Sequence, residues 1–228
     1  MKNTGANKFL GQFFLPILIG SFFGLPSAHA EILGEVDIRL IDANPDAPIK
    51  LRHDCLFHDI DGEYVYRWAE GSGLAGQTNC GFKDGEAQLR DARSVWILHS
   101  VRAPSRAEPG VDAEYFIFEA KGKRKCMISR QVGDFYQVVL KKFPGGGPVC
   151  GTTLNRLARD GNALWNPELG AIRSYATDRC LIFKNEGFDT FPTLFRWSSE
   201  PEYAKFCGLP SQRDLAVNQA AFTIDLLR

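Results

Sequence analysis

The sequence has few of the side chains on which enzyme mechanisms depend. It contains four histidines, and three of them, His53, His58 and His99, lie beyond residue 30. It has no Gly-x-Ser-x-Gly turn, so a serine hydrolase that uses this motif is unsupported. It has no Cys-x-x-Cys pair, so zinc-ribbon and thioredoxin-like chemistry are unsupported as well. We therefore expect no catalytic site, no metal and no cofactor.

The sequence also lacks a strong net charge and a second long apolar run. Residues 31–228 hold 25 basic and 27 acidic side chains, a net charge of about −2. This balance does not favour nucleic acid or an anionic membrane surface as a partner. No segment after residue 30 is apolar enough to cross a bilayer, so we expect no transmembrane anchor.

The single long apolar run has the pattern of a secretory signal peptide. Lys2 and Lys8 precede an apolar segment over residues 9–26, and small residues lead to a cleavage site after Ala30. Interruptions by polar, glycine and proline residues disfavour the alternative of an uncleaved anchor. We expect residues 31–228 to be secreted or periplasmic, with a length that suits one domain.

All six cysteines lie in this exported part. An even number of cysteines in an oxidising compartment indicates disulfides, although the count alone allows fifteen pairings. The cysteines are of two alternating kinds: Cys55, Cys126 and Cys180 precede two apolar residues, and Cys80, Cys150 and Cys207 precede a glycine. A cysteine of the first kind is followed by one of the second kind after 25, 24 and 27 residues.

Aromatic residues repeat with the cysteines. One follows each Cys-Gly by 15 or 16 residues, and another lies between the two cysteines of each pair. They are Trp96, Trp165 and Phe222 in the first position, and Trp68, Phe143 and Trp197 in the second. Such recurrence indicates a threefold internal repeat. We expect all six aromatic side chains to fill the central core.

The repeat is predicted to consist of short β-strands. Segments such as KCMIS, FYQVVLKKF and EYFIFEA are rich in β-branched and aromatic residues, and stretches with glycine and proline separate them. Four strands fit into each copy, which gives twelve strands from residues 48–52 to residues 221–226. EVDIRLI (35–41) is left over as an additional N-terminal strand or strap, and we assign residues 31–47 to this strap.

This order of strands and markers resembles the ricin B-like β-trefoils over about residues 48–226. LWNPELGAIRSYATDRCLIF (164–183) carries the resemblance best, with an aromatic strand, an Ile-Arg-Ser strand and a Cys-Leu strand in succession. The resemblance implies an all-β single domain, a β-trefoil of three four-stranded repeats. It also implies one disulfide in each repeat, which gives Cys55–Cys80, Cys126–Cys150 and Cys180–Cys207.

The sugar-binding residues of those lectins are not matched. The resemblance would place an aspartate two residues after each first cysteine, at positions held by Phe57, Ile128 and Ile182. It would place the glutamine of Gln-x-Trp at Ser94, Ala163 and Ala220. Sugar hydroxyls would lose their main fixed partners without this set. We therefore assign no binding residue from the resemblance.

Three local patterns are predicted to be structural. His53 and His58 are five residues apart, so they point to opposite faces of a strand and are poorly placed to share a metal. We expect a half-buried strand there, with its polar residues on the outer face. KGKRK (121–125) is predicted to be a solvated turn, with a heparin-like glycan site as the alternative, and FPGGGPVCG (143–151) a hairpin loop.

The stretch RAPSRAEPGVD (102–112) occurs in the first copy only, and long loops in compact domains are often functional. We predict a non-enzymatic binding protein, either lectin-like or the binding subunit of an exported complex or toxin. Its partner would be a glycan or a protein held by surface loops. A trefoil-type protease inhibitor, with Arg102 or Arg106 as its specificity residue, is the alternative, and an enzyme ranks last.

Peptide mapping under non-reducing conditions tests the register of the repeat. We expect three linked peptide pairs, one within each copy. Each link closes a loop of roughly 25 residues, which stabilises the fold by about 3 kcal/mol through restriction of the unfolded chain. A link between Cys80 and Cys126 would break the register and, with it, the trefoil interpretation.

Overall fold

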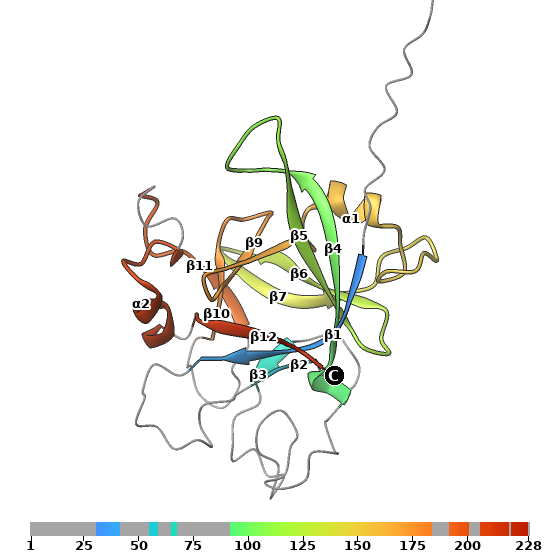
Figure 1. Cartoon of the computed structure of the whole chain (residues 1–228), viewed down its shortest axis with the longest axis horizontal. Helices are drawn as coiled ribbons and strands as arrows, with labels where there is room; N and C mark the ends of the chain where they lie inside the picture. The colour runs from blue at the N-terminus through green and yellow to red at the C-terminus, as the bar shows by residue number, and fades with distance from the viewer. Residues whose placement is uncertain are drawn as a thin grey trace, which may run out of the picture.

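The structure is a computed structural model that describes residues 31–41, 55–58, 65–67, 92–183, 192–200, 206–218 and 220–227. Several features expected from the sequence lie outside these residues: the signal segment 1–30, the strand at 48–52, His53, Trp68 and Cys80. Within the described residues the fold is dominated by β-strands (Figure 1).

Residues 31–120 contain β1 (Glu31–Leu40), β2 (Leu56–His58), β3 (Val65–Arg67), β4 (Trp96–Pro104) and β5 (Asp112–Ala120). Residues 125–174 contain β6 (Lys125–Val132), β7 (Phe135–Lys141), α1 (Leu154–Asp160), β8 (Trp165–Glu168) and β9 (Ala171–Ser174). Residues 180–226 contain β10 (Cys180–Phe183), β11 (Pro192–Phe195), α2 (Gln212–Val217) and β12 (Phe222–Leu226). Neither α1 nor α2, nor any other described helix, is long and apolar enough to span a membrane.

Ten strands form one antiparallel sheet in the order β12-β1-β4-β5-β6-β7-β11-β10-β9-β8. β8 also pairs with β5 through Phe116 and Trp165, and this closes the seven strands from β5 to β8 into a barrel. β2 and β3 form a separate hairpin. The fold class is all-β, as the sequence predicts.

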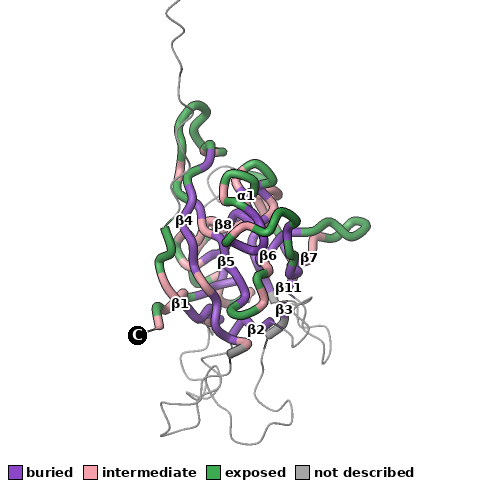
Figure 2. Tube along the Cα trace, turned by 90° about the vertical axis from the view of Figure 1, so that its right-hand side faces the viewer, coloured by how far each residue is buried: buried purple, intermediate pink, exposed green. Residues whose placement is uncertain are grey.

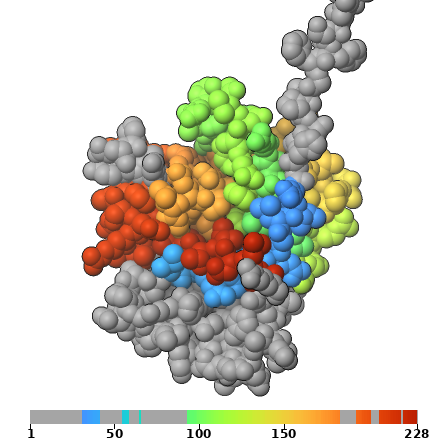
Figure 3. All heavy atoms as spheres, in the orientation of Figure 1, coloured from blue at the N-terminus to red at the C-terminus, as the bar shows by residue number. Residues whose placement is uncertain are grey.

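The N-terminal segment expected as an additional strand or strap is β1, which lies between β12 and β4. Val36 is opposite Leu226 on one side and Trp96 on the other. Figure 3 shows β1 in blue beside β12 in red across the front of the molecule. Val36 and Ile38 are two residues apart, so their side chains point to the same face of the strand, and both are fully buried. Residues 31–40 are therefore an integral strand of the sheet.

β1 also carries a buried carboxylate, Asp37. Arg39 donates to its two oxygens from Nε and Nη2 at 3.1 and 2.9 Å. Burial lowers the pKa of Arg39, but the hydrogen bond and charge of Asp37 and the charge of Asp225 outweigh burial and hold this pKa above its ordinary value. The guanidinium therefore stays charged and makes the buried carboxylate tolerable.

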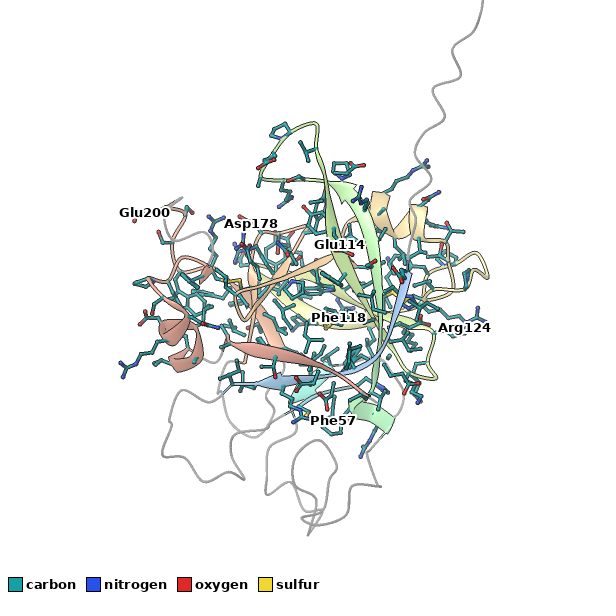
Figure 4. The ribbon with its side chains drawn as sticks, viewed as in Figure 1. Phe57, Glu114, Phe118, Arg124, Asp178 and Glu200 are labelled. Atoms are coloured by element: carbon teal, nitrogen blue, oxygen red, sulfur yellow. A yellow bond between two sulfur atoms is a disulfide. The ribbon has the colours of Figure 1, made fainter. Side chains whose placement is uncertain are left out.

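Three of the expected aromatic markers share the main core. Trp96, Trp165 and Phe222 are buried there, together with Phe118, which lies near the centre of the molecule in Figure 4. The indole Nε1 of Trp96 donates to the carbonyl of Leu56, and that of Trp165 to the carbonyl of Met127, both at 3.0 Å. Each acceptor residue follows the first cysteine of its pair. An indole hydrogen bond of the same kind therefore joins β4 to β2 and β8 to β6.

The expectation that all six aromatics fill one core is wrong for Phe143 and Trp197. Phe143 lies in a second cluster with Cys126 and Cys150, and half-buried Trp197 packs against a third that contains Cys180 and Cys207. The backbone N–H of Phe143 donates to the carbonyl of Cys150 at 2.8 Å, and that of Trp197 to the carbonyl of Cys207 at 2.9 Å. These two residues fix the chain at the disulfides, away from the main core.

The disulfides Cys126–Cys150 and Cys180–Cys207 are present as predicted, with Cα atoms 5.3 and 5.9 Å apart. Cys55 is also disulfide-bonded, and its predicted partner Cys80 lies outside the described residues. No described cysteine is free.

The glycines that follow Cys150 and Cys207 have a steric cause. Gly151 and Gly208 have φ of +85° and +88°, a region that favours glycine. A Cβ at Gly208 would lie 2.0 Å from the backbone nitrogen of Ser198, and one at Gly151 would lie 2.5 Å from the carbonyl oxygen of Phe143. At both of these Cys-Gly pairs, a second chain segment lies too close to leave room for a side chain.

Replacement of Trp165 tests the indole bond. Trp165→Phe should lower the free energy of unfolding by about 1–3 kcal/mol, because the buried carbonyl of Met127 loses its donor. Trp197→Phe is the control, and it should cost less than about 1 kcal/mol because this ring is half-buried. Urea unfolding measures both changes. Equal losses would contradict a special role for the Trp165 indole.

Candidate functional site

The insertion at 102–112 is the end of a long hairpin. β4 and β5 are nine residues long, whereas β8 and β9 are four residues long. The hairpin projects beyond the barrel in Figure 1, and its tip is exposed in Figure 2. A bond of 2.7 Å from the N–H of Ser105 to the carbonyl of Val111 closes the tip, so the segment is an ordered arm.

Arg106, at this tip, is folded back onto the domain. Its guanidinium lies 5.2 Å from the ring centroid of Tyr175, and its Nη2 donates to the carbonyl of Ala176 at 3.0 Å. Tyr175 in turn packs edge-to-face on Tyr115 at 4.8 Å. A protease inhibitor needs a specificity side chain that can enter the protease. Arg106 instead fastens the hairpin to the turn after β9.

A polar groove of about 700 Å³ runs along β6 and β7. Its apolar floor includes Ile128 and Val139. Its polar lining consists of Ser129, Arg130, Gln131, Lys141, Asn162 and Thr177. Tyr136 adds an aromatic side chain, and the guanidinium of Arg179 lies 4.8 Å from the centroid of that ring.

Hydrogen bonds hold the groove in shape. The carbonyl of Asn162 accepts two hydrogen bonds from Ser129, one from its backbone N–H at 3.0 Å and one from the hydroxyl Oγ of the same serine at 3.4 Å. The side-chain Nδ2 of Asn162 donates to Oδ1 of Asp160 at 2.8 Å. The segment after α1 is thus fastened to β6, and its polar groups are preorganised for a ligand.

The groove opens over a position that the sequence singled out. Ile128 lies two residues after Cys126, where the resemblance would place a sugar-binding aspartate. Since Ile128 is apolar, polar contacts to a ligand must come from neighbours such as Arg130, Gln131 and Asn162. These three residues did not stand out in the sequence. Along β6, the buried residues are followed by the exposed polar pair Arg130-Gln131, and this change from apolar to polar residues could have marked these two as surface candidates.

His58 and His99 take structural positions. In the described part of the strand, Leu56, Phe57 and His58 are all buried, so the expected polar outer face is wrong for His58; its ring meets that of Trp96 edge-to-face at 5.5 Å. His99 Nε2 lies 2.9 Å from a carboxylate oxygen of Glu119, and both side chains are buried. Across the part of the chain that the structure describes, no three His, Cys, Asp or Glu side chains gather as metal ligands.

The basic run 121–125 begins with an exposed turn between β5 and β6, as predicted. Lys121 pairs with Glu35 at 2.7 Å, and Arg124 Nη2 donates to the carbonyl of Gly147 at 2.8 Å. The latter bond ties the run to the glycine-rich loop 143–151.

Comparison with known proteins finds no relative: no protein-family model and no curated protein matches the chain. The fold and the groove along β6 and β7 are therefore the features from which function can be inferred.

Proposed function

We propose that the protein is an exported, non-enzymatic β-trefoil that binds an oligosaccharide in the groove along β6 and β7. The observation that carries this proposal is the composition of that groove: one aromatic ring, two amides, two hydroxyls and two cations over an apolar floor. Specific sites for small ligands combine an apolar lining with a few fixed polar groups in this way. Disulfides and the predicted signal segment favour an extracellular or periplasmic setting.

The trefoil part is supported by three equivalent sets of strands. β1, β5 and β9 each meet a strand that begins at a first cysteine, in the pairs Arg39–Cys55, Glu119–Cys126 and Arg173–Cys180. Each of these cysteines opens a hairpin, β2–β3, β6–β7 or β10–β11. β1 thereby takes the place in the first set that the sequence assigned to residues 48–52.

The remaining contacts follow the same threefold pattern. β4 pairs with β5, β8 with β9, and β12 with β1. β1 pairs with β4 and β5 with β8, and a bond of 2.6 Å from the N–H of Phe222 to the carbonyl of Gly170 joins β12 to the start of β9. β3, β7 and β11, the second strands of the three hairpins, contact one another. A β-trefoil has six barrel strands and three capping hairpins, for which we propose β1, β4, β5, β8, β9 and β12 and the pairs β2–β3, β6–β7 and β10–β11. The closed ring from β5 to β8 combines strands of both kinds.

The groove suits the chemistry of a sugar. The apolar face of a pyranose can pack on the exposed part of Tyr136, and its hydroxyls can bond to amide, guanidinium and ammonium groups. Arg130 and Lys141 supply donors only, and Gln131 and Asn162 carry both donors and acceptors. Such a site binds and orients a ligand. The described residues that line this groove include no paired acid and base, so we propose a binding role.

A glycan array probed with residues 31–228 tests the proposal. We expect a defined set of glycans to bind, and Tyr136→Ala to weaken binding by about tenfold, because a stacked aromatic contributes about 1–2 kcal/mol. Phe135→Ala is the matched control: this side chain is 72% exposed, lies on the same strand and is not part of the groove, so binding should be unchanged.

Circular dichroism and unfolding midpoints of both variants establish that any loss is local. Silence across a broad array would end the glycan proposal. Capture of one protein partner in its place would turn the assignment to the binding subunit of an exported complex.

A further inference from the structure

We infer that the ligand is an acidic oligosaccharide that extends from the β6–β7 groove into a second, arginine-lined groove beneath the β4–β5 hairpin. This inference rests on the proposed function and adds the ligand's charge and the site's second half.

The second groove has a volume of about 460 Å³ and lies between the hairpin, α1 and the turn after β9. Arg102 and Arg106 come from the hairpin, Arg159 from α1, and Tyr175 from the turn. Figure 2 shows α1 beside β4, which agrees with the contacts between these two elements.

The two grooves adjoin each other. Both are lined by Ala176, and both draw on the segments 160–162 and 175–177. Asp160 and Gly161 line the second groove, and the next residue, Asn162, lines the first. A linear ligand of several sugar units can therefore lie across both.

The combined surface is basic although the exported chain is slightly acidic. Its lining holds five cations and one carboxylate: Arg102, Arg106, Arg130, Lys141, Arg159 and Asp160. The carboxylate of Asp160 is already engaged by two donors of Asn162. Even with Glu114 added, which lies opposite Arg102 in the β4–β5 register, five cations face two carboxylates.

Three of these cations are available to a ligand: the side chains of Arg102, Arg130 and Arg159 are exposed and, among the described residues, form no ion pair or hydrogen bond. The ammonium of Lys141 lies 4.7 Å from the centroid of the Phe143 ring. Arg106 is held in place by Tyr175 and by the carbonyl of Ala176, so its orientation is fixed before a ligand arrives. Guanidinium groups bind carboxylate and sulfate through paired hydrogen bonds. A neutral sugar leaves these charges unused, whereas a uronate or a sulfate ester matches them.

An exposed ion pair contributes little by itself, and salt screens it. Several converging cations add up, so affinity for an acidic ligand should fall steeply with ionic strength. Salt dependence thus separates recognition of the anionic group from recognition of the sugar ring.

The test compares three oligosaccharides of equal length, one neutral, one with uronate units and one sulfated. Dissociation constants are measured with residues 31–228 at low and high salt, about 0.05 and 0.5 M. We expect at least one acidic ligand to bind about tenfold tighter than the neutral one at low salt, with the difference lost at high salt. The tighter of the two identifies the anionic group.

The variant Arg102→Gln/Arg106→Gln/Arg159→Gln should lose the preference for the acidic ligand and keep the neutral affinity. The matched control is Arg124→Gln/Arg156→Gln/Arg213→Gln, which removes three exposed arginines outside both grooves. Arg124 and Arg156 also donate to loop carbonyls, as Arg106 does. In Figure 4, Arg124 lies across the molecule from Asp178, which follows the turn shared by the two grooves.

Four outcomes would overturn the inference. Equal, salt-independent affinity for all three oligosaccharides would overturn it and leave the proposed function intact. Equal losses of affinity for the acidic oligosaccharide in the two triple variants would show that the preference comes from the overall charge of the protein. Competition by polyglutamate as strong as that by the acidic oligosaccharide would show that the surface does not read a sugar. Absence of binding to every oligosaccharide would overturn the proposed function as well.

Discussion

The structure depends on the position of one side chain, Trp165. Its backbone pairs with Phe116, the bridge that joins β8 to β5 and closes the barrel. Its indole N–H donates to the carbonyl of Met127 and so joins β8 to β6 from inside the core. β6 in turn supplies Ile128 to Gln131 of the groove. The surface at which we place the ligand is thus held by a hydrogen bond buried beneath it, where water cannot compete for either partner.

Gly161 has a similar role at the rim. It ends α1 at φ +73°, where its N–H donates to the carbonyl of Leu157. A Cβ there would lie 3.1 Å from the ring of Tyr175, so the helix end and the turn after β9 touch through a residue with no side chain. Asp160 and Asn162 on either side of Gly161 face the two grooves. One left-handed residue thereby sets the geometry of the wall that both grooves share.

The sequence allowed the strands and two disulfides to be predicted because cysteines and aromatics recur in register with the strands. It did not show that residues 35–41, expected as an additional strand or strap, are a member of the main sheet, because only the pairing of β1 with β12 and β4 decides this. The strand expected at 48–52 lies outside the described residues. The sequence failed for Phe143 because hydrophobicity does not tell which of several clusters a residue joins. The groove was missed because its polar residues come from separate segments, spread over residues 129–177, that share no motif.

The long hairpin departs from the threefold pattern that we propose. β4 and β5 extend well beyond the barrel, whereas their counterparts β8 and β9 are joined by a two-residue turn. Since the second groove needs this arm, the described residues build it once. On the proposal above, this groove holds one glycan in each domain, so cross-linking of cells or polymers through it would require a second copy or an attached partner.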